Sequence, residues 1–104
     1  MKNVGIIGNG FVGNAIATGL IGYVDNIRIF DLHPERATNT LDEVVNQSDV
    51  VFVSVPTPSH PDGSINLDIL HDVLSAINSI NKTLSKKQSF LYLTIYFLFN
   101  ILFL

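Results

Sequence analysis

The feature that most constrains the fold of this chain is the GNGFVG motif at residues 8–13, which spaces its glycines as G-x-G-x-x-G. The motif directly follows the apolar run Val4–Ile7, and apolar residues then recur at helical spacing from Val12 to Ile21. A short apolar run bounded by glycine is typical of a strand buried on both faces. We therefore predict a strand that ends at the motif, a tight turn, and a helix over about 11–21 that stops before Gly22.

Each glycine of this motif meets a different physical need. Gly8 permits the tight turn out of the strand, Gly10 lets the backbone approach a pyrophosphate, and Gly13 lets the helix pack close to the sheet. The main-chain N–H groups of Phe11 and Val12 would then face the phosphates at the positive end of the helix dipole. The same pattern by itself is also compatible with a glycine-rich turn that binds no ligand.

Asp31 strengthens the interpretation as a dinucleotide site. It ends a second β-rich run, Asn26–Phe30, about 20 residues beyond the glycines, where such sites place a carboxylate that accepts hydrogen bonds from the adenosine ribose. A carboxylate there repels a 2′-phosphate, so NAD is favoured over NADP, although Arg36 leaves a smaller case for the phosphorylated form. We expect His33 to be a solvated loop residue.

The remaining pattern continues the alternation of strands and helices. Leu41–Gln47 predicts a short helix, Val50–Val55 a third strand, and the apolar spacing from Leu67 a third helix with Asn66 as its N-cap. The order β-α-β-α-β-α implies parallel strands with right-handed crossovers. We predict an α/β, Rossmann-like fold: a mostly parallel sheet of order 3-2-1-4, numbered along the chain, with flanking helices in a single incomplete domain.

The third strand leads into a loop rich in proline, VPTP at residues 55–58, with Asp62-Gly63 further on. Prolines make this loop rigid, and it lies at the carboxyl end of a strand, which is where open α/β sheets bind ligands. Thr57 is held between two of these prolines.

Taken together, GNGFVG, Asp31, the VSVPTP run and the DGS that follows resemble the N-terminal NAD-binding domain of the UDP-glucose/GDP-mannose dehydrogenase family, over about residues 1–81. The resemblance implies NAD as cofactor. It also implies oxidation of the C6 alcohol of a nucleotide sugar to a carboxylate by the full-length enzyme, in polysaccharide biosynthesis. The residues that match the family's cofactor-binding positions are Gly8, Gly10, Phe11, Val12, Gly13, Asp31, Arg36 and Thr57.

The family's catalytic residues have no counterpart in this chain. The resemblance implies a catalytic cysteine that carries a thiohemiacetal intermediate. The sequence contains no cysteine and no S-T-V-P motif. We therefore predict no catalytic residue, and a nucleotide sugar as partner only in a full-length enzyme. Two other interpretations stay open: the cofactor domain of a 3-hydroxyacid-type NAD dehydrogenase, and a non-catalytic or membrane-tethered nucleotide-binding remnant.

Composition excludes several other classes. With 6 basic and 9 acidic residues and a net charge of -3, the chain has no basic field, so nucleic acid is not expected as a partner. The absence of cysteine excludes disulfides and thiolate metal sites. Asp68 and Asp72, one helical turn apart, are explained by the helix dipole and solvent, so no metal site is predicted.

The N-terminus does not read as a secretory signal, which favours the cytoplasm. Nothing here predicts an oligomeric state.

The end of the chain differs in composition from the rest. Residues 89–104 carry no charge, and only Ser89, Thr94 and Asn100 in them are not apolar. We therefore divide the chain into an NAD-binding domain at 1–88 and a hydrophobic tail at 89–104.

The first part of this tail, Ser89–Phe97, fits a fourth strand beside the first. As a helix, Phe90–Leu104 would span only about 22 Å, which is too short to cross a bilayer. The remainder has the character of an aggregation-prone segment. We expect a truncated or frame-shifted copy of a longer gene, with a tail anchor preceded by Lys86 and Lys87 as the alternative.

Overall fold

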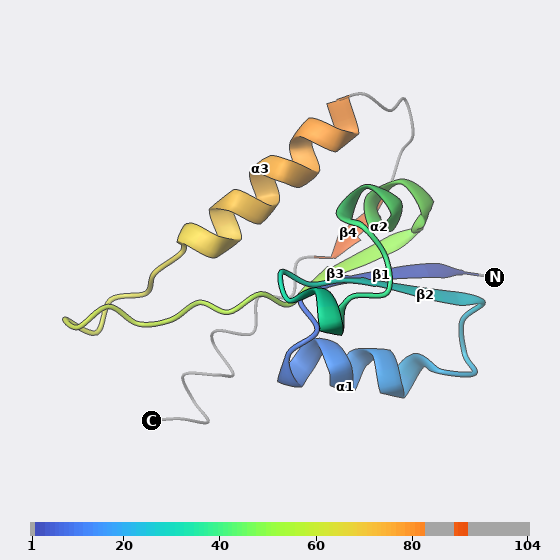
Figure 1. Ribbon diagram of the computed structural model, residues 1–104, viewed down its shortest axis with the longest axis horizontal. Coiled ribbons are helices and arrows are strands. Elements are labelled where there is room, and N and C mark those ends of the chain that lie inside the picture. Colours follow the sequence, from blue (N-terminus) through green and yellow to red (C-terminus); the bar gives the residue numbers. More distant parts are fainter. Residues whose placement is uncertain (1, 83–88, 92–104) are drawn as a thin grey trace.

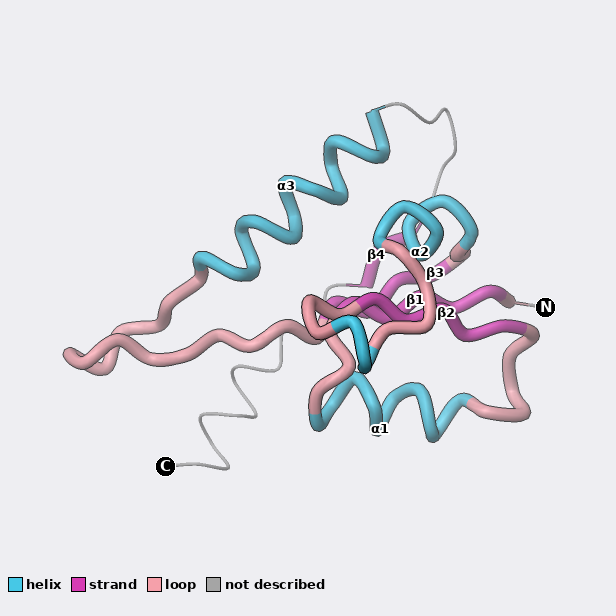
Figure 2. Tube along the Cα trace, in the orientation of Figure 1, coloured by secondary structure: helices cyan, strands magenta, loops and turns pink. Residues whose placement is uncertain are grey.

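The computed structural model describes residues 2–82 and 89–91, and in them the chain folds into a parallel sheet with helices on both faces (Figure 1, Figure 2). The α/β, Rossmann-like prediction is confirmed. The elements along the chain are β1 (Asn3–Ile7), α1 (Phe11–Leu20), β2 (Asn26–Phe30), the 3-10 turn η1 (Pro34–Arg36), α2 (Leu41–Gln47), β3 (Val50–Val53), α3 (Asp68–Lys82) and β4 (Ser89–Leu91).

The sheet separates two hydrophobic cores. Helix α1 lies on one face, while α2 and α3 lie on the other (Figure 1). On the α1 side, Ala17 packs with Val4 and Ile6 of β1. On the opposite side, a larger core joins β1 and β3 to the two other helices through Ile7, Val44, Val45, Val51, Val53, Val55, Val73 and Ile77. Both faces of β1 are therefore covered, as its continuous apolar run predicts.

The predicted strand order, 3-2-1-4, is wrong. The sheet runs β2-β1-β3-β4 with every neighbouring pair parallel, so β3 pairs with β1 and β4 pairs with β3. The registers place Ile6 opposite both Ile29 and Phe52. The chain therefore returns across β1 after β2 instead of continuing outward, and the glycine turn and the proline-rich loop end up side by side.

Gly5 in the middle of β1 permits this return. A side chain at Gly5 would stand 2.5 Å from the Ser48 hydroxyl and 2.7 Å from a Val44 methyl, so glycine is what allows α2 to cross β1 closely. The outer edge of β2 is occupied by an irregular segment, because the main-chain N–H groups of Thr38 and Asn39 both donate to the Ile29 carbonyl at 2.9 Å. That segment takes the place where the prediction put a strand.

Element boundaries follow the sequence expectations closely. The ranges of β2 and α2 are as predicted, α1 stops one residue early at Leu20, and β3 leaves the ladder at Val53. Helix α3 begins at Asp68, and the Asn66 side chain accepts a hydrogen bond of 2.9 Å from the Asp68 N–H, so it caps the first turn from two residues away. The part of the predicted fourth strand beyond Leu91, and the tail that follows it, lie outside the described residues.

Within residues 2–82 and 89–91, no helix is long and apolar enough to cross a membrane.

Candidate functional site

The glycine turn after β1 has the tight geometry that the motif requires. Gly8 has φ +100, in the left-handed region that favours glycine, and its N–H donates to the Phe30 carbonyl at 2.8 Å. A side chain at Gly8 would also collide with the carbonyl oxygen of Ser54, which follows β3. The turn is therefore pressed between the ends of β2 and β3.

Gly13 and Gly10 have opposite surroundings. A side chain at Gly13 would collide with the Gly8 carbonyl, so this glycine allows α1 to pack against the turn. A side chain at Gly10 would meet no protein atom within 4 Å and would instead extend into open space at the N-terminus of α1. Glycine at position 10 therefore leaves the space beside the N-terminus of α1 open, and no contact within the protein requires a glycine there.

Asp31 directly follows β2, and two main-chain groups orient its carboxylate. The Asn9 N–H donates to Oδ2 at 2.7 Å, and the His33 N–H donates to Oδ1 at 2.8 Å. Each carboxylate oxygen has a second lone pair, so both can still accept hydrogen bonds from a ligand. The carboxylate is thus held beside the glycine turn in a fixed orientation.

Two hydroxyl groups beyond β3 are buried without partners. Thr57 is only 6% exposed, and neither its Oγ1 nor Ser54 Oγ has a hydrogen-bond partner in the described part of the chain. A buried hydroxyl without a partner costs roughly 1–3 kcal/mol, so such groups call for an explanation. Both residues line the same cleft, so a ligand there would lie close to these hydroxyls.

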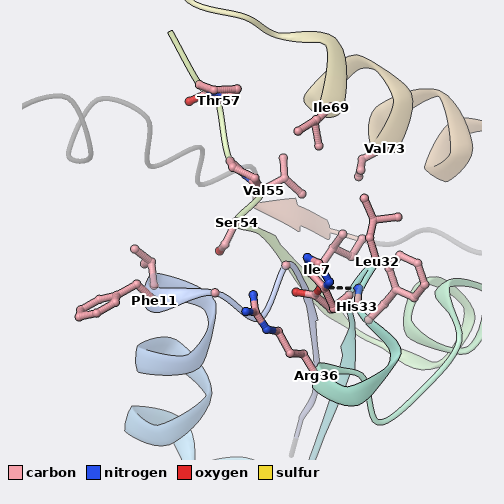
Figure 3. A pocket seen from close by; sticks show the side chains of 17 residues that line it. Ile7, Phe11, Leu32, His33, Arg36, Ser54, Val55, Thr57, Ile69 and Val73 are labelled. Atoms are coloured by element: carbon pink, nitrogen blue, oxygen red, sulfur yellow. Dashed lines mark hydrogen bonds between the residues drawn. The ribbon is translucent and has the colours of Figure 1, made fainter. Parts of the chain in front are cut away.

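These features surround one cleft of about 490 Å³ at the carboxyl ends of β1, β2 and β3 (Figure 3). The chain runs from β1 to β2 in one direction and from β3 to β4 in the other, so the cleft lies at the switch point where open α/β sheets bind ligands. Of the predicted site residues, the ones that line it are Gly8, Gly10, Phe11, Val12, Asp31, Arg36 and Thr57. Gly13 is buried behind the turn.

The charged side chains of the cleft come from the segment after β2. Arg36, on η1, extends towards the glycine turn (Figure 3), and no carboxylate pairs with it within the described ranges. His33 is exposed, as expected, and its Nδ1 lies 3.8 Å from a carboxylate oxygen of Glu35. The cleft therefore combines an oriented carboxylate with a guanidinium that is free to meet a ligand.

Sequence reasoning missed part of the lining. Val55, Ile69 and Val73 form an apolar wall, and Ser54 adds its buried hydroxyl. Ile69 and Val73 are on α3, where they follow an ordinary core pattern, so no sequence signal separates them from other buried positions. Asn9 does not line the cleft, but its N–H orients the Asp31 carboxylate. This residue was also missed, because the G-x-G pattern leaves its position unspecified.

Comparison with known proteins supports the fold and assigns a family. The family model for the UDP-glucose/GDP-mannose dehydrogenase family, NAD binding domain, matches residues 32–91. Among solved structures, a UDP-glucose dehydrogenase from the hyperthermophilic archaeon Pyrobaculum islandicum matches with a TM-score of 0.79 and 18% identity. That alignment covers 90% of this chain and 29% of that chain, so this chain spans less than a third of its length. No curated protein matches the chain.

The fold and the cleft define a dinucleotide-binding α/β domain. Because the family model covers more than half of the sequence, the chain belongs to the UDP-glucose/GDP-mannose dehydrogenase family and represents its NAD-binding domain. NAD is the cofactor that this domain binds. The family assignment also decides against the 3-hydroxyacid-type alternative.

Proposed function

We propose that this chain is the cofactor-binding part of a nucleotide-sugar 6-dehydrogenase. The observation that carries the proposal is the hydrogen bond of 2.7 Å from the Asn9 N–H to the Asp31 carboxylate, which joins the glycine turn and the ribose-type acceptor into one site. A phosphate at the turn and a ribose at Asp31 are then adjacent, as they are in a dinucleotide.

The proposed roles follow from position. The N–H groups of Phe11 and Val12 at the start of α1 receive the pyrophosphate, with Gly10 leaving the space open and Gly8 and Gly13 shaping the turn. Asp31 accepts from the adenosine ribose hydroxyls, and Arg36 lies beside that ribose. Thr57 uses its buried hydroxyl for the cofactor. The apolar wall on α3 offers a surface for an aromatic base.

In the full-length enzyme, oxidation of the C6 alcohol of a UDP- or GDP-linked sugar to a carboxylate would remove four electrons and take up one water. Two NAD molecules, bound one after the other, would each accept one hydride. A role in polysaccharide biosynthesis and a cytoplasmic location belong to the same proposal. The division into a domain at 1–88 and a tail at 89–104 stays a prediction as well. The strand β4 begins at Ser89 and extends the sheet of the domain.

The test is a calorimetric titration of the 104-residue chain with NAD and with NADP. We expect tighter binding of NAD, because the Asp31 carboxylate accepts from the ribose and repels a 2′-phosphate. Replacing Asp31 by Ala should weaken NAD binding roughly ten- to a hundredfold, since a hydrogen bond to a charged group contributes about 1.5–3 kcal/mol. In Asp31→Ala, the difference between the affinities for NAD and for NADP should become smaller.

Asp42→Ala is the matched control, because it removes an exposed carboxylate of α2 that does not line the cleft. Its affinities for both cofactors should equal those of the unaltered chain. Equal affinity of the unaltered chain for NAD and NADP, or no binding by folded protein, would contradict the proposed function.

A further inference from the structure

The Asn9 side chain connects the two halves of the cofactor cleft, and this connection is not part of the glycine motif. Its Nδ2 donates to the Arg36 carbonyl at 2.9 Å, while its main-chain N–H donates to Asp31. Asn9 therefore contacts both residues that are proposed to lie beside the ribose, although it belongs to the turn that receives the phosphates.

The Arg36 carbonyl is a group that needs such a donor. Arg36 is the last residue of η1, and the final carbonyls of a helical turn have no partner within it. Inside η1 and its flanks, the Arg36 N–H donates to the His33 carbonyl at 2.9 Å and the Ala37 N–H to the Pro34 carbonyl at 3.2 Å. The amide of Asn9 supplies the missing donor for Arg36 from another element.

This link fixes the segment that carries Arg36 and leaves the Arg36 side chain free. The hydrogen bond is exposed to solvent, so water can replace it and its loss costs the fold little. Its loss does release the backbone of Arg36 from the glycine turn. The guanidinium, which extends towards that turn (Figure 3), would then have to be ordered again when the cofactor binds.

We propose that Asn9 is a positioning residue that determines cofactor affinity through Arg36. This inference rests on the proposed function, because it assumes that the cleft receives NAD. It assigns to Asn9 a role that the spacing of the glycines does not require. It also accounts for an asparagine whose Oδ1 is buried without a partner in the described part of the chain, since the position of that amide is set by its Nδ2 bond.

The test is a double-mutant cycle in the full chain, with NAD affinity measured by calorimetry for the unaltered protein, Asn9→Ala, Arg36→Ala and the double variant. Asn9→Ala should weaken NAD binding roughly three- to tenfold, the range of one ordinary hydrogen bond. In the Arg36→Ala background the same change should weaken binding less than about twofold, because the group it positions is gone. Asn78→Ala, an exposed asparagine of α3 outside the cleft, serves as control and should bind as the unaltered chain does.

Each outcome separates this proposal from the proposed function. If the unaltered chain binds no NAD, both fail. If it binds NAD and Asn9→Ala binds equally well, only the role of Asn9 fails. If Asn9→Ala loses the same factor with and without Arg36, Asn9 acts on the turn itself and positioning through Arg36 is overturned. A melting temperature that falls strongly in Asn9→Ala would likewise assign the residue to stability.

Discussion

Gly10 and Gly19 are both glycines at which an added side chain would meet no protein atom within 4 Å. They differ in what lies around them, because Gly10 lines the cleft at the start of α1, whereas Gly19 is exposed near the other end of the same helix. The pair therefore allows the ligand's need for space to be separated from the protein's own need for glycine.

We predict that Gly10→Val reduces NAD affinity at least tenfold, because the new side chain occupies the space through which a pyrophosphate approaches the backbone. The circular dichroism spectrum should stay nearly unchanged. Gly19→Val makes the same substitution on the same helix and should leave NAD affinity intact. Retained binding by Gly10→Val would place the phosphates elsewhere.

At the scale of elements, helix α2 determines how the sheet is assembled. It begins with a capping box in which the Thr40 hydroxyl accepts from the Glu43 N–H and the Glu43 carboxylate accepts from the Thr40 N–H. Its buried residues Val44 and Val45 then cover β1, where Gly5 allows the close crossing. The well-defined start of this short helix therefore directs the chain to its place between β2 and β3.

The capping box makes the stability of this element depend on pH. Hydrogen bonds from Thr40, chiefly from its main-chain N–H, hold the pKa of Glu43 below its ordinary value of 4.5. A carboxyl whose pKa is lowered by folding stabilises the native state above its unfolded pKa, and this contribution is lost as the pH falls through the lowered value.

Glu43→Gln tests this dependence, because glutamine does not titrate. The difference in unfolding free energy between the unaltered chain and Glu43→Gln, measured by urea denaturation, should be greatest above about pH 4.5 and should shrink towards pH 3. A difference that stays constant from pH 7 to pH 3 would mean that the charge of Glu43 contributes nothing to the cap.

At the scale of the whole molecule, the cleft brings together most of the residues proposed to bind NAD, and the sequence contains no cysteine that could supply a thiolate. When an enzyme of this family oxidises the alcohol to an acid, a cysteine is expected to hold the aldehyde-level intermediate. The chain also spans only 29% of the dehydrogenase structure that it matches.

We predict that the 104-residue chain binds NAD but forms no acid product from UDP-glucose or GDP-mannose. The measurement is NADH absorbance together with product analysis after mixing purified chain, NAD and each sugar. A control with the Gly10→Val chain sets the background. Acid formation above that background would show that the cysteine route is dispensable.

The local features of this protein were predictable from its sequence because their causes are local. Glycine at position 8 allows a positive φ, and helical and strand periodicities delimit β2 and α2 to the residue. Asp31 follows a strand at the expected distance from the glycines, and Thr57 lies in a loop made rigid by neighbouring prolines. These properties depend on a few adjacent residues, so the sequence by itself determined the parts of the site.

Only the tertiary structure decided how these parts meet. Strand order depends on contacts between distant residues, and the apolar run of β3 would suit a place beside β2 as well as one beside β1. Gly5 permits the observed order, because it admits α2 across β1. The pairing of β3 with β1 then places the Ser54 carbonyl against Gly8 of the glycine turn. The bond from Asn9 to Arg36 likewise joins two loops that periodicity cannot relate. Which strands and loops pair depends on the summed free energy of contacts between residues far apart in the sequence. Local sequence patterns therefore do not predict it.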